Sequence, residues 1–120
     1  SICFDVRFPA LYRYYATNDV DLVVVPAAFT RVTGEAHWHT LLRSRAIENG
    51  LFIAASALCG VTQEGRETYG HSVIYDPWGE CVGELDDLPG CLTVDIDRTL
   101  VRKIRSQIPV LSQNRIFDKN

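Results

Sequence analysis

Short apolar runs alternate with longer amphipathic segments along this chain. Residues 22–25 form a continuous apolar run, and residues 51–58 are apolar apart from Ser56. Runs of this kind are typical of strands buried on both faces. We expect Pro26 to end the first run, because proline cannot donate a hydrogen bond to a sheet. Residues 8–16 and 34–49 space their apolar side chains as helices do. The alternation predicts an α/β fold in which strands on either side of a helix run parallel.

The ends of the two predicted helices carry matching signals. Pro9 suits the start of the first helix, because proline fits a helix's first turn. Thr33 is expected to cap the second helix and Gly50 to end it. Arg45 and Glu48 lie three residues apart on that helix. This spacing favours a structural ion pair over a catalytic role for Glu48.

The second half of the sequence predicts a meander of strands followed by a helix. Residues 76–79 (Asp-Pro-Trp-Gly) form a turn signal, so the strands on either side of them should pair antiparallel. Asp97 is expected to cap the last helix. The remaining predicted elements are a polar loop over 59–68, strands over 69–76, 80–85 and 91–95, and a helix over 98–107.

Composition narrows the classes of partner. The 120 residues are 47% hydrophobic and 22% charged, as in an ordinary globular domain. A net charge of −3 provides no basic surface for nucleic acid. The run 51–58 is too short to cross a membrane. We therefore expect one domain at most, with neither nucleic acid nor membrane as a partner.

The chain has four cysteines, and their spacing matters more than their number. None stands in a C-x-x-C pair or at zinc-finger spacing, so we expect no metal, redox motif or cofactor. Reduced thiols and a cytoplasmic location are expected in a chain of this apolar content. The four are Cys3, Cys59, Cys81 and Cys91.

Cys3 occupies a position suited to a nucleophile. It follows what the pattern predicts to be the end of a strand and precedes a helix start. A thiol there lies near the positive end of a helix dipole, which favours the thiolate, and the turn leaves backbone N–H groups free for an oxyanion. Residues 26–29 end a neighbouring parallel strand and should lie nearby. Spacing alone favours a packed strand cysteine, because cysteine is among the most buried residue types.

Five stretches occur in the order typical of one enzyme family. They are CFDVRFP (3–9), VVVPAAFT (23–30), TGEAHWHTLLRSRAIEN (33–49), YGHSVIYDPWGE (69–80) and IPVLSQNR (108–115). Together they resemble the nitrilase superfamily of carbon–nitrogen hydrolases over essentially the whole chain. The resemblance implies an α/β fold that is half of a four-layer α-β-β-α sandwich, with mixed sheets and flanking helices. It also implies hydrolysis of a small-molecule amide.

The resemblance implies roles for particular residues. Cys3 attacks the amide carbonyl, and the backbone N–H of Phe4 is one oxyanion donor. Ala27, Ala28 and Phe29 are expected beside the thiol, the two alanines leaving room for substrate. The sequence after Cys3 resembles an amidase-like branch that acts on ω-amides of dicarboxylic acids and on deaminated glutathione.

Arg7 has two interpretations at this point. Its guanidinium suits a substrate carboxylate, because it binds that group through two hydrogen bonds. The alternative is a structural ion pair with Asp5 or another neighbour.

The family also uses a glutamate base and a lysine, and both come before the cysteine in its members. Only Ser1 and Ile2 precede Cys3, and Lys103 and Lys119 do not match the family's lysine motif. We therefore expect residues 1–120 to be the C-terminal part of one longer hydrolase domain. The resemblance also implies a homodimer or larger assembly, built partly by helices 8–16 and 34–49. A non-catalytic half-fold that serves as an interaction surface or pseudoenzyme is the alternative.

The three histidines offer weaker alternatives. A papain-like pair of Cys3 with His37, His39 or His71 lacks that family's local cysteine signature. Metal binding by His37 and His39 is disfavoured, because helical residues two apart point to nearly opposite sides.

Overall fold

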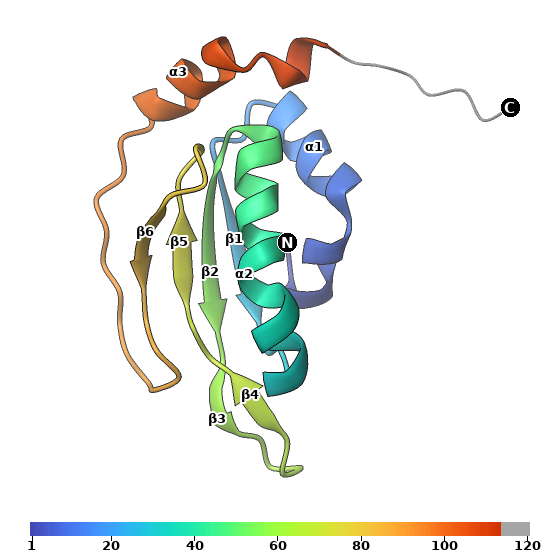
Figure 1. Cartoon of the computed structure of the whole chain (residues 1–120), viewed down its shortest axis with the longest axis vertical. Helices are drawn as coiled ribbons and strands as arrows, with labels where there is room; N and C mark the ends of the chain where they lie inside the picture. Colours follow the sequence, from blue (N-terminus) through green and yellow to red (C-terminus); the bar gives the residue numbers. More distant parts are fainter. Residues whose placement is uncertain (114–120) are drawn as a thin grey trace, which may run out of the picture.

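A four-stranded mixed sheet forms the centre of the computed structural model, which describes residues 1–113 (Figure 1). Its strands, in spatial order, are β1 (Leu22–Ala27), β2 (Phe52–Ala57), β5 (Val73–Tyr75) and β6 (Cys81–Glu84). β1 and β2 pair parallel, whereas β5 and β6 add antiparallel. The predicted α/β class, parallel pair and antiparallel meander are confirmed. Lys119 and the last two residues of the IPVLSQNR stretch lie outside the described residues.

The prediction that Pro26 ends the first strand is wrong. β1 continues through Pro26 to Ala27. The carbonyls of Asp21 and Ala27 accept hydrogen bonds from the N–H groups of Phe52 and Leu58, on the β2 side. Because backbone groups alternate in direction along a strand, the nitrogen of Pro26 faces the outer edge. An edge strand tolerates proline there, since no ladder hydrogen bond is lost.

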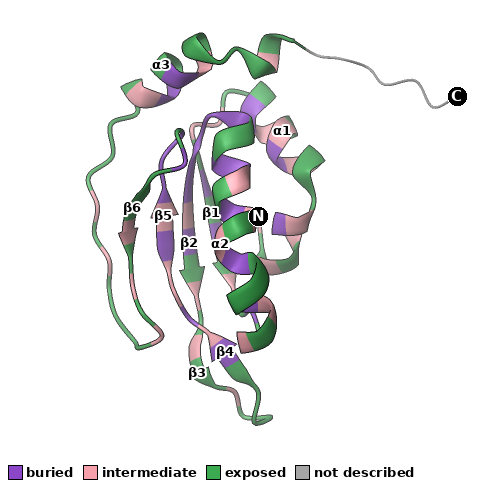
Figure 2. Ribbon diagram, viewed as in Figure 1, coloured by how far each residue is buried: buried purple, intermediate pink, exposed green. Residues whose placement is uncertain are grey.

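Helices cover one face of the sheet. Helices α1 (Pro9–Thr17) and α2 (Arg31–Asn49) lie on this face, with α2 crossing between the two parallel strands (Figure 1). Figure 2 shows buried positions along the sheet and on the helix sides turned to it. The core beneath the helices includes Tyr12, Trp38, Leu42, Val25 and Ile53.

The start of α2 differs from the prediction. The helix begins at Arg31, and Thr30 is its cap: the Thr30 hydroxyl accepts a hydrogen bond from the Thr33 N–H. The motif has two threonines three residues apart, and the sequence signal for a cap fits either. Gly50 ends the helix in the left-handed conformation, as predicted.

The region predicted as a polar loop forms a small hairpin instead. Strands β3 (Cys59–Val61) and β4 (Glu67–Tyr69) pair antiparallel as a separate two-stranded sheet. Gly70 and His71 both have positive φ. These two residues break the single strand predicted over 69–76 into β4 and β5.

The end of the described chain contains no strand over residues 91–95, which corrects that prediction. Helix α3 (Thr99–Gln107) and the short 3-10 helix η2 (Val110–Ser112) follow. The Asp97 carboxylate accepts the Thr99 N–H at 2.9 Å, so it supports the helix start as expected. Arg98 pairs with Asp21 and thereby ties the start of α3 to the sheet.

The second face of the sheet is open. Within residues 1–113 no helix covers this face, and Val24 is 60% exposed on it while Val23 and Val25 are buried. The pattern of β1 is typical of a strand covered on both faces, and among the described residues only the helical side has cover. A hollow of about 290 Å³ lies on the open face, lined in part by Val24, Ala54, Ser56, Ile74, Leu85 and Leu92.

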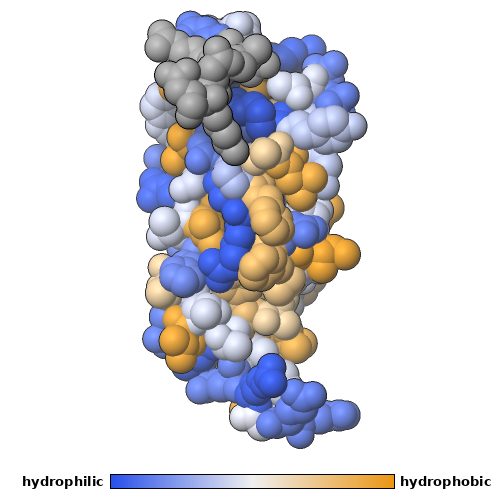
Figure 3. Space-filling model, turned by 90° about the vertical axis from the view of Figure 1, so that its right-hand side faces the viewer, coloured by the Kyte–Doolittle hydropathy of each residue, from blue (hydrophilic) through white to orange (hydrophobic). Residues whose placement is uncertain are grey.

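Apolar surface also remains along the edge of the molecule. Figure 3 looks from the side of α1 and shows apolar side chains exposed in a band down the middle of that view. Ile2 and Phe4 are 68% and 63% exposed. None of the described helices is long and apolar enough to span a membrane.

Candidate active site

Cys3 stands at a sharp bend in the backbone. Ile2 before it is extended, and the five-residue 3-10 helix η1 (Cys3–Arg7) begins with it. Cys3 itself has φ +43°, in the left-handed region. A residue other than glycine pays conformational energy for that geometry, which recurs at strained functional turns such as nucleophile elbows. The predicted turn is confirmed, and the 3-10 helix within it was not predicted.

Local hydrogen bonds within the turn hold this bend. The Ile2 N–H donates to the Asp5 carboxylate at 2.8 Å, and the Asp5 N–H donates to the Ile2 carbonyl at 2.9 Å. The Phe8 N–H donates to the Asp5 carbonyl at 2.9 Å and leads the chain into α1. Asp5 therefore fastens both ends of η1, and its carboxylate is engaged with backbone.

Arg45 supports the same turn from α2. Its side chain is almost completely buried, and Nε donates to the Val6 carbonyl at 2.9 Å. Nη1 pairs with Glu48 at 2.9 Å, which confirms the predicted structural ion pair. The guanidinium also lies over the Tyr12 ring, 5.8 Å from its centroid. The contact with Val6 could not be foreseen, because nothing in the helix pattern indicates which backbone carbonyl Arg45 reaches.

Tyr12 packs behind the turn. Its hydroxyl oxygen lies 2.6 Å from Ser1 Oγ, within a hydrogen bond. Burial raises the pKa of the Tyr12 phenol, while the hydrogen bond with Ser1 and the nearby Arg45 charge lower it by less. Tyr12 is therefore neutral at physiological pH, and its buried ring packs against the turn while its hydroxyl is hydrogen-bonded to Ser1.

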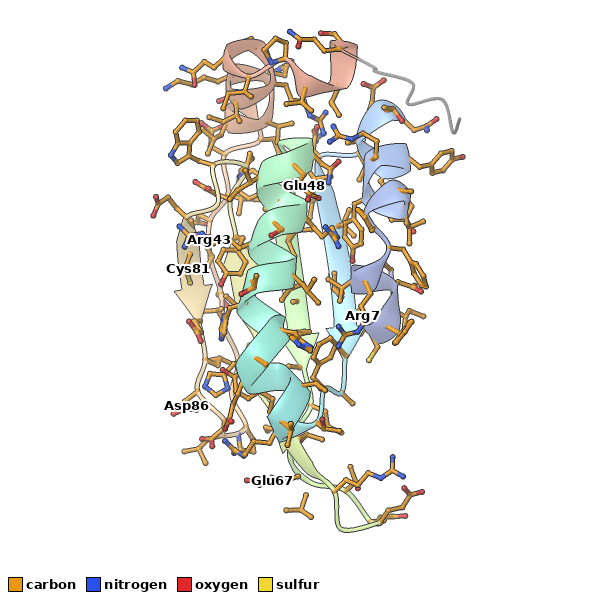
Figure 4. All side chains as sticks on the ribbon, turned by 45° about the vertical axis from the view of Figure 1, so that its right-hand side comes forward. Arg7, Arg43, Glu48, Glu67, Cys81 and Asp86 are labelled. Atoms are coloured by element: carbon orange, nitrogen blue, oxygen red, sulfur yellow. The ribbon has the colours of Figure 1, made fainter. Side chains whose placement is uncertain are left out.

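Arg7 extends from η1 toward α2 (Figure 4). Its guanidinium carbon lies 5.3 Å from the centroid of the Phe29 ring and 5.7 Å from that of Phe4. Nη2 lies 3.3 Å from His37 Nδ1. Within residues 1–113 Arg7 forms no ion pair, so the predicted alternative of a pair with Asp5 is not found.

The other predicted site residues are Phe4, Ala27, Ala28 and Phe29, and they differ in burial and in their contacts. No hydrogen bond from the Phe4 N–H is present in the described part of the chain, which is the condition an oxyanion donor needs. Phe29 is buried in the core, Ala27 is half-buried and Ala28 is exposed. The geometry brings Phe29 to Arg7, and both Cys3 and Ala27 pack against the same core cluster.

The remaining histidines lie elsewhere. His39 Nδ1 is 3.0 Å from the Tyr75 hydroxyl, and Nε2 is 3.4 Å from Glu84. His71 stacks on Tyr69 with ring centroids 4.1 Å apart. Over residues 1–113, no three His, Cys, Asp or Glu side chains are grouped to hold a metal ion, and all four cysteines are free thiols.

Comparison with known proteins shows which family the chain belongs to. The model of the carbon–nitrogen hydrolase family matches residues 1–106. The chain belongs to the carbon–nitrogen hydrolase family. A deaminated glutathione amidase from Synechocystis is 45% identical over 117 residues, which are 98% of this hydrolase chain and 43% of that protein. The chain thus spans less than half the length of such relatives.

Solved structures give the same fold for this carbon–nitrogen hydrolase chain. Saccharomyces cerevisiae Nit3, of the nitrilase superfamily, superposes with a TM-score of 0.89 at 33% identity, covering 97% of this chain and 43% of that one. An amidase from Nesterenkonia, described with acrylamide added to its active-site cysteine, has a TM-score of 0.72 at 35% identity over 90% of this chain and 42% of its own. The predicted nitrilase-like fold is confirmed.

Proposed function

We propose that this chain carries the nucleophile and part of the substrate site of an amidase that cleaves a small, carboxylate-bearing amide. The Cys3 thiolate attacks the amide carbonyl, and the oxyanion that forms accepts a hydrogen bond from the Phe4 N–H. The carbon–nitrogen bond then breaks as the leaving nitrogen takes a proton and departs as ammonia. Water attacks the resulting thioester, which releases the carboxylic acid and restores the thiol.

The observation that carries this proposal is the position of Arg7 on the same short 3-10 helix as Cys3. The Arg7 guanidinium forms no ion pair among residues 1–113, and the Cys3 backbone has a positive φ. The Asp5 carboxylate accepts the Ile2 N–H instead of pairing with Arg7. Guanidinium favours planar anions, which it binds through paired N–H groups. We propose that the small side chains of Ala27 and Ala28 leave space for such a substrate near the thiol.

Catalysis needs a general base and a further cation, and no glutamate or lysine among residues 1–113 matches the family's motifs for these roles. Lys103 lies exposed on α3, and Glu48 is engaged with Arg45. The chain covers 43% of the Synechocystis relative, so most of such a protein lies outside it. We propose that a glutamate base and a lysine from the rest of the protein complete the site.

The test is replacement of Cys3 by serine in the complete natural protein. We expect ammonia release from a panel of ω-monoamides of dicarboxylic acids to fall by at least about 1,000-fold, because serine at this site lacks a readily formed anion. Mass spectrometry of the unchanged protein should detect an acyl adduct on the peptide that contains Cys3. The matched control is Cys81→Ser on β6, where the thiol is exposed and activity should be retained.

Two outcomes contradict the proposal. Full activity of the Cys3→Ser protein would exclude Cys3 as the nucleophile. A complete absence of amide hydrolysis by the unchanged protein would favour the non-catalytic alternative, in which the fold serves as an interaction surface.

The setting of the reaction is also a proposal. We place the protein in the cytoplasm, where four free thiols stay reduced. We further propose a homodimer or larger assembly in which α1 and α2 contribute to the contact. The exposed ring of Tyr14 on α1 and the exposed Ile47 on α2 fit that role.

A further inference from the structure

The guanidinium of Arg7 is oriented by a neighbour on another element. His37 lies on α2, thirty residues further along the chain, and its Nδ1 atom is 3.3 Å from Arg7 Nη2. The Phe29 ring, buried at the end of β1, lies 5.3 Å from the guanidinium carbon. Arg7 on η1, His37 on α2 and Phe29, which follows β1, therefore meet at the Arg7 guanidinium.

The His37 atom that contacts Arg7 determines which of the two residues donates the hydrogen bond. A guanidinium has donors and no acceptor, so Nδ1 must accept the hydrogen bond from Nη2. The imidazole is then neutral and carries its proton on Nε2. Such a contact adds no charge to the site, and it fixes the plane of a long side chain that is otherwise free to rotate.

We propose that His37 is a positioning residue for Arg7: its Nδ1 atom and the Phe29 ring hold the guanidinium in the plane that presents its free N–H pair to a substrate carboxylate. The inference rests on the proposed function, and it deepens that function by naming what sets the preference for carboxylate-bearing amides. His37 itself does not touch the reacting atoms. Its contribution is a smaller loss of side-chain freedom when the carboxylate binds.

The choice of variants follows from the geometry. His37→Leu removes the acceptor and keeps a side chain of similar width. His37→Asn places its amide oxygen close to where Nδ1 was, so it restores an acceptor for Arg7. His39→Asn is the matched control, because His39 is two residues further along the same helix and contacts Tyr75 and Glu84 instead.

The experiment compares two substrates in the complete natural protein. One is the best ω-monoamide of the panel described above, and the other is the amide of the same length without its carboxylate. We expect His37→Leu to raise KM for the carboxylate-bearing amide by about 3- to 10-fold with kcat nearly unchanged, the usual effect of one hydrogen bond. KM for the neutral amide should not change. His37→Asn should restore KM to within about 2-fold.

A binding measurement makes the inference independent of turnover. Calorimetry with glutarate, on protein that also carries Cys3→Ser, should show affinity weakened by His37→Leu and restored by His37→Asn. Equal KM changes for both substrates, or failure of His37→Asn to restore binding, would overturn the inference while leaving the role of Cys3 intact. Activity that survives Cys3→Ser would instead overturn the proposed function, and the glutarate measurement would still decide the role of His37.

Discussion

At the scale of the residue, the backbone of Cys3 is the most telling feature. An L-residue in the left-handed region costs about 1–2 kcal/mol, and Cys3 is held there at φ +43°. The turn is fastened by Asp5 from within and by Arg45 from α2. The fold therefore keeps a strained cysteine in place through contacts that do not involve its thiol.

This strain predicts that glycine at position 3 stabilises the protein relative to alanine, the reverse of the usual order. We expect Cys3→Gly to unfold at higher denaturant concentration than Cys3→Ala, with a difference in unfolding free energy of about 0.5–1 kcal/mol. Guanidinium unfolding of the complete protein at fixed concentration measures it. At Cys81, where φ is not positive, the alanine variant should be the more stable of the pair. A Cys3→Gly variant less stable than Cys3→Ala would show that the turn is unstrained.

The sequence predicts Cys3 and Arg7 as site residues, because both lie in the short stretch CFDVRFP that carries the family resemblance. It did not identify His37 or Arg45 as neighbours of the turn at Cys3. Both lie thirty or more residues away on α2. Helical periodicity specifies which face of the helix a side chain occupies, and it does not specify which residues that face contacts. His37 was considered only as a base or metal ligand, and its contact with Arg7 became visible once α2 was packed beside η1.

At the scale of the element, α2 is the main scaffold of the site. It carries His37 and Arg45 toward η1 and places Trp38 and Leu42 in the core. Gly34 in its first turn is buried, and a Cβ atom built there would overlap the Tyr69 side chain. The absence of a side chain at this position lets α2 lie close against β4.

Gly34→Ala therefore tests two opposed effects. Helix propensity alone would stabilise the protein by about 1 kcal/mol. We expect the overlap with Tyr69 to dominate and to destabilise it by about 1–3 kcal/mol, as overpacking does in tight cores. Denaturant unfolding of the complete protein gives the sign. In a Tyr69→Gly background, which also removes the Tyr69 Cβ atom that takes part in the overlap, the same substitution should become neutral or stabilising. Persistence of the full loss there would contradict the steric explanation.

Most helices and strands followed from periodicity, with shifts at their ends. The hairpin of β3 and β4 was missed because its strands have three residues each, too few to show alternation. The predicted strand over 91–95 has no partner ladder in the described chain. Pairing depends on neighbours in space, and the local sequence alone cannot supply that information.

At the scale of the whole molecule, the sheet has one covered face and one open face. Val24 is exposed on the open face, and a hollow of about 290 Å³ is lined by apolar side chains. In a four-layer sandwich such a face packs against a second sheet. Residues 1–113 leave this surface uncovered, and apolar surface in contact with water costs stability.

The isolated polypeptide 1–120 should therefore bind a hydrophobic dye strongly and unfold over a broad temperature range. The complete natural protein should bind little dye and unfold sharply, because its apolar faces are covered. Dye fluorescence and calorimetry on the two proteins at equal molar concentration make the comparison. A sharp transition without dye binding in the isolated polypeptide would mean that the open face needs no cover.

Pro26 limits the hydrogen bonds that the outer edge of β1 can make. Its nitrogen faces the outer edge of β1, where it offers no donor to an approaching strand. Ser1 approaches the same edge, where its amino group donates to the Val24 carbonyl at 3.1 Å. A strand that paired along this edge would lack one ladder hydrogen bond at position 26. The residue that the pattern marked as the end of a strand thus limits how tightly a neighbour can pair with β1 on this side.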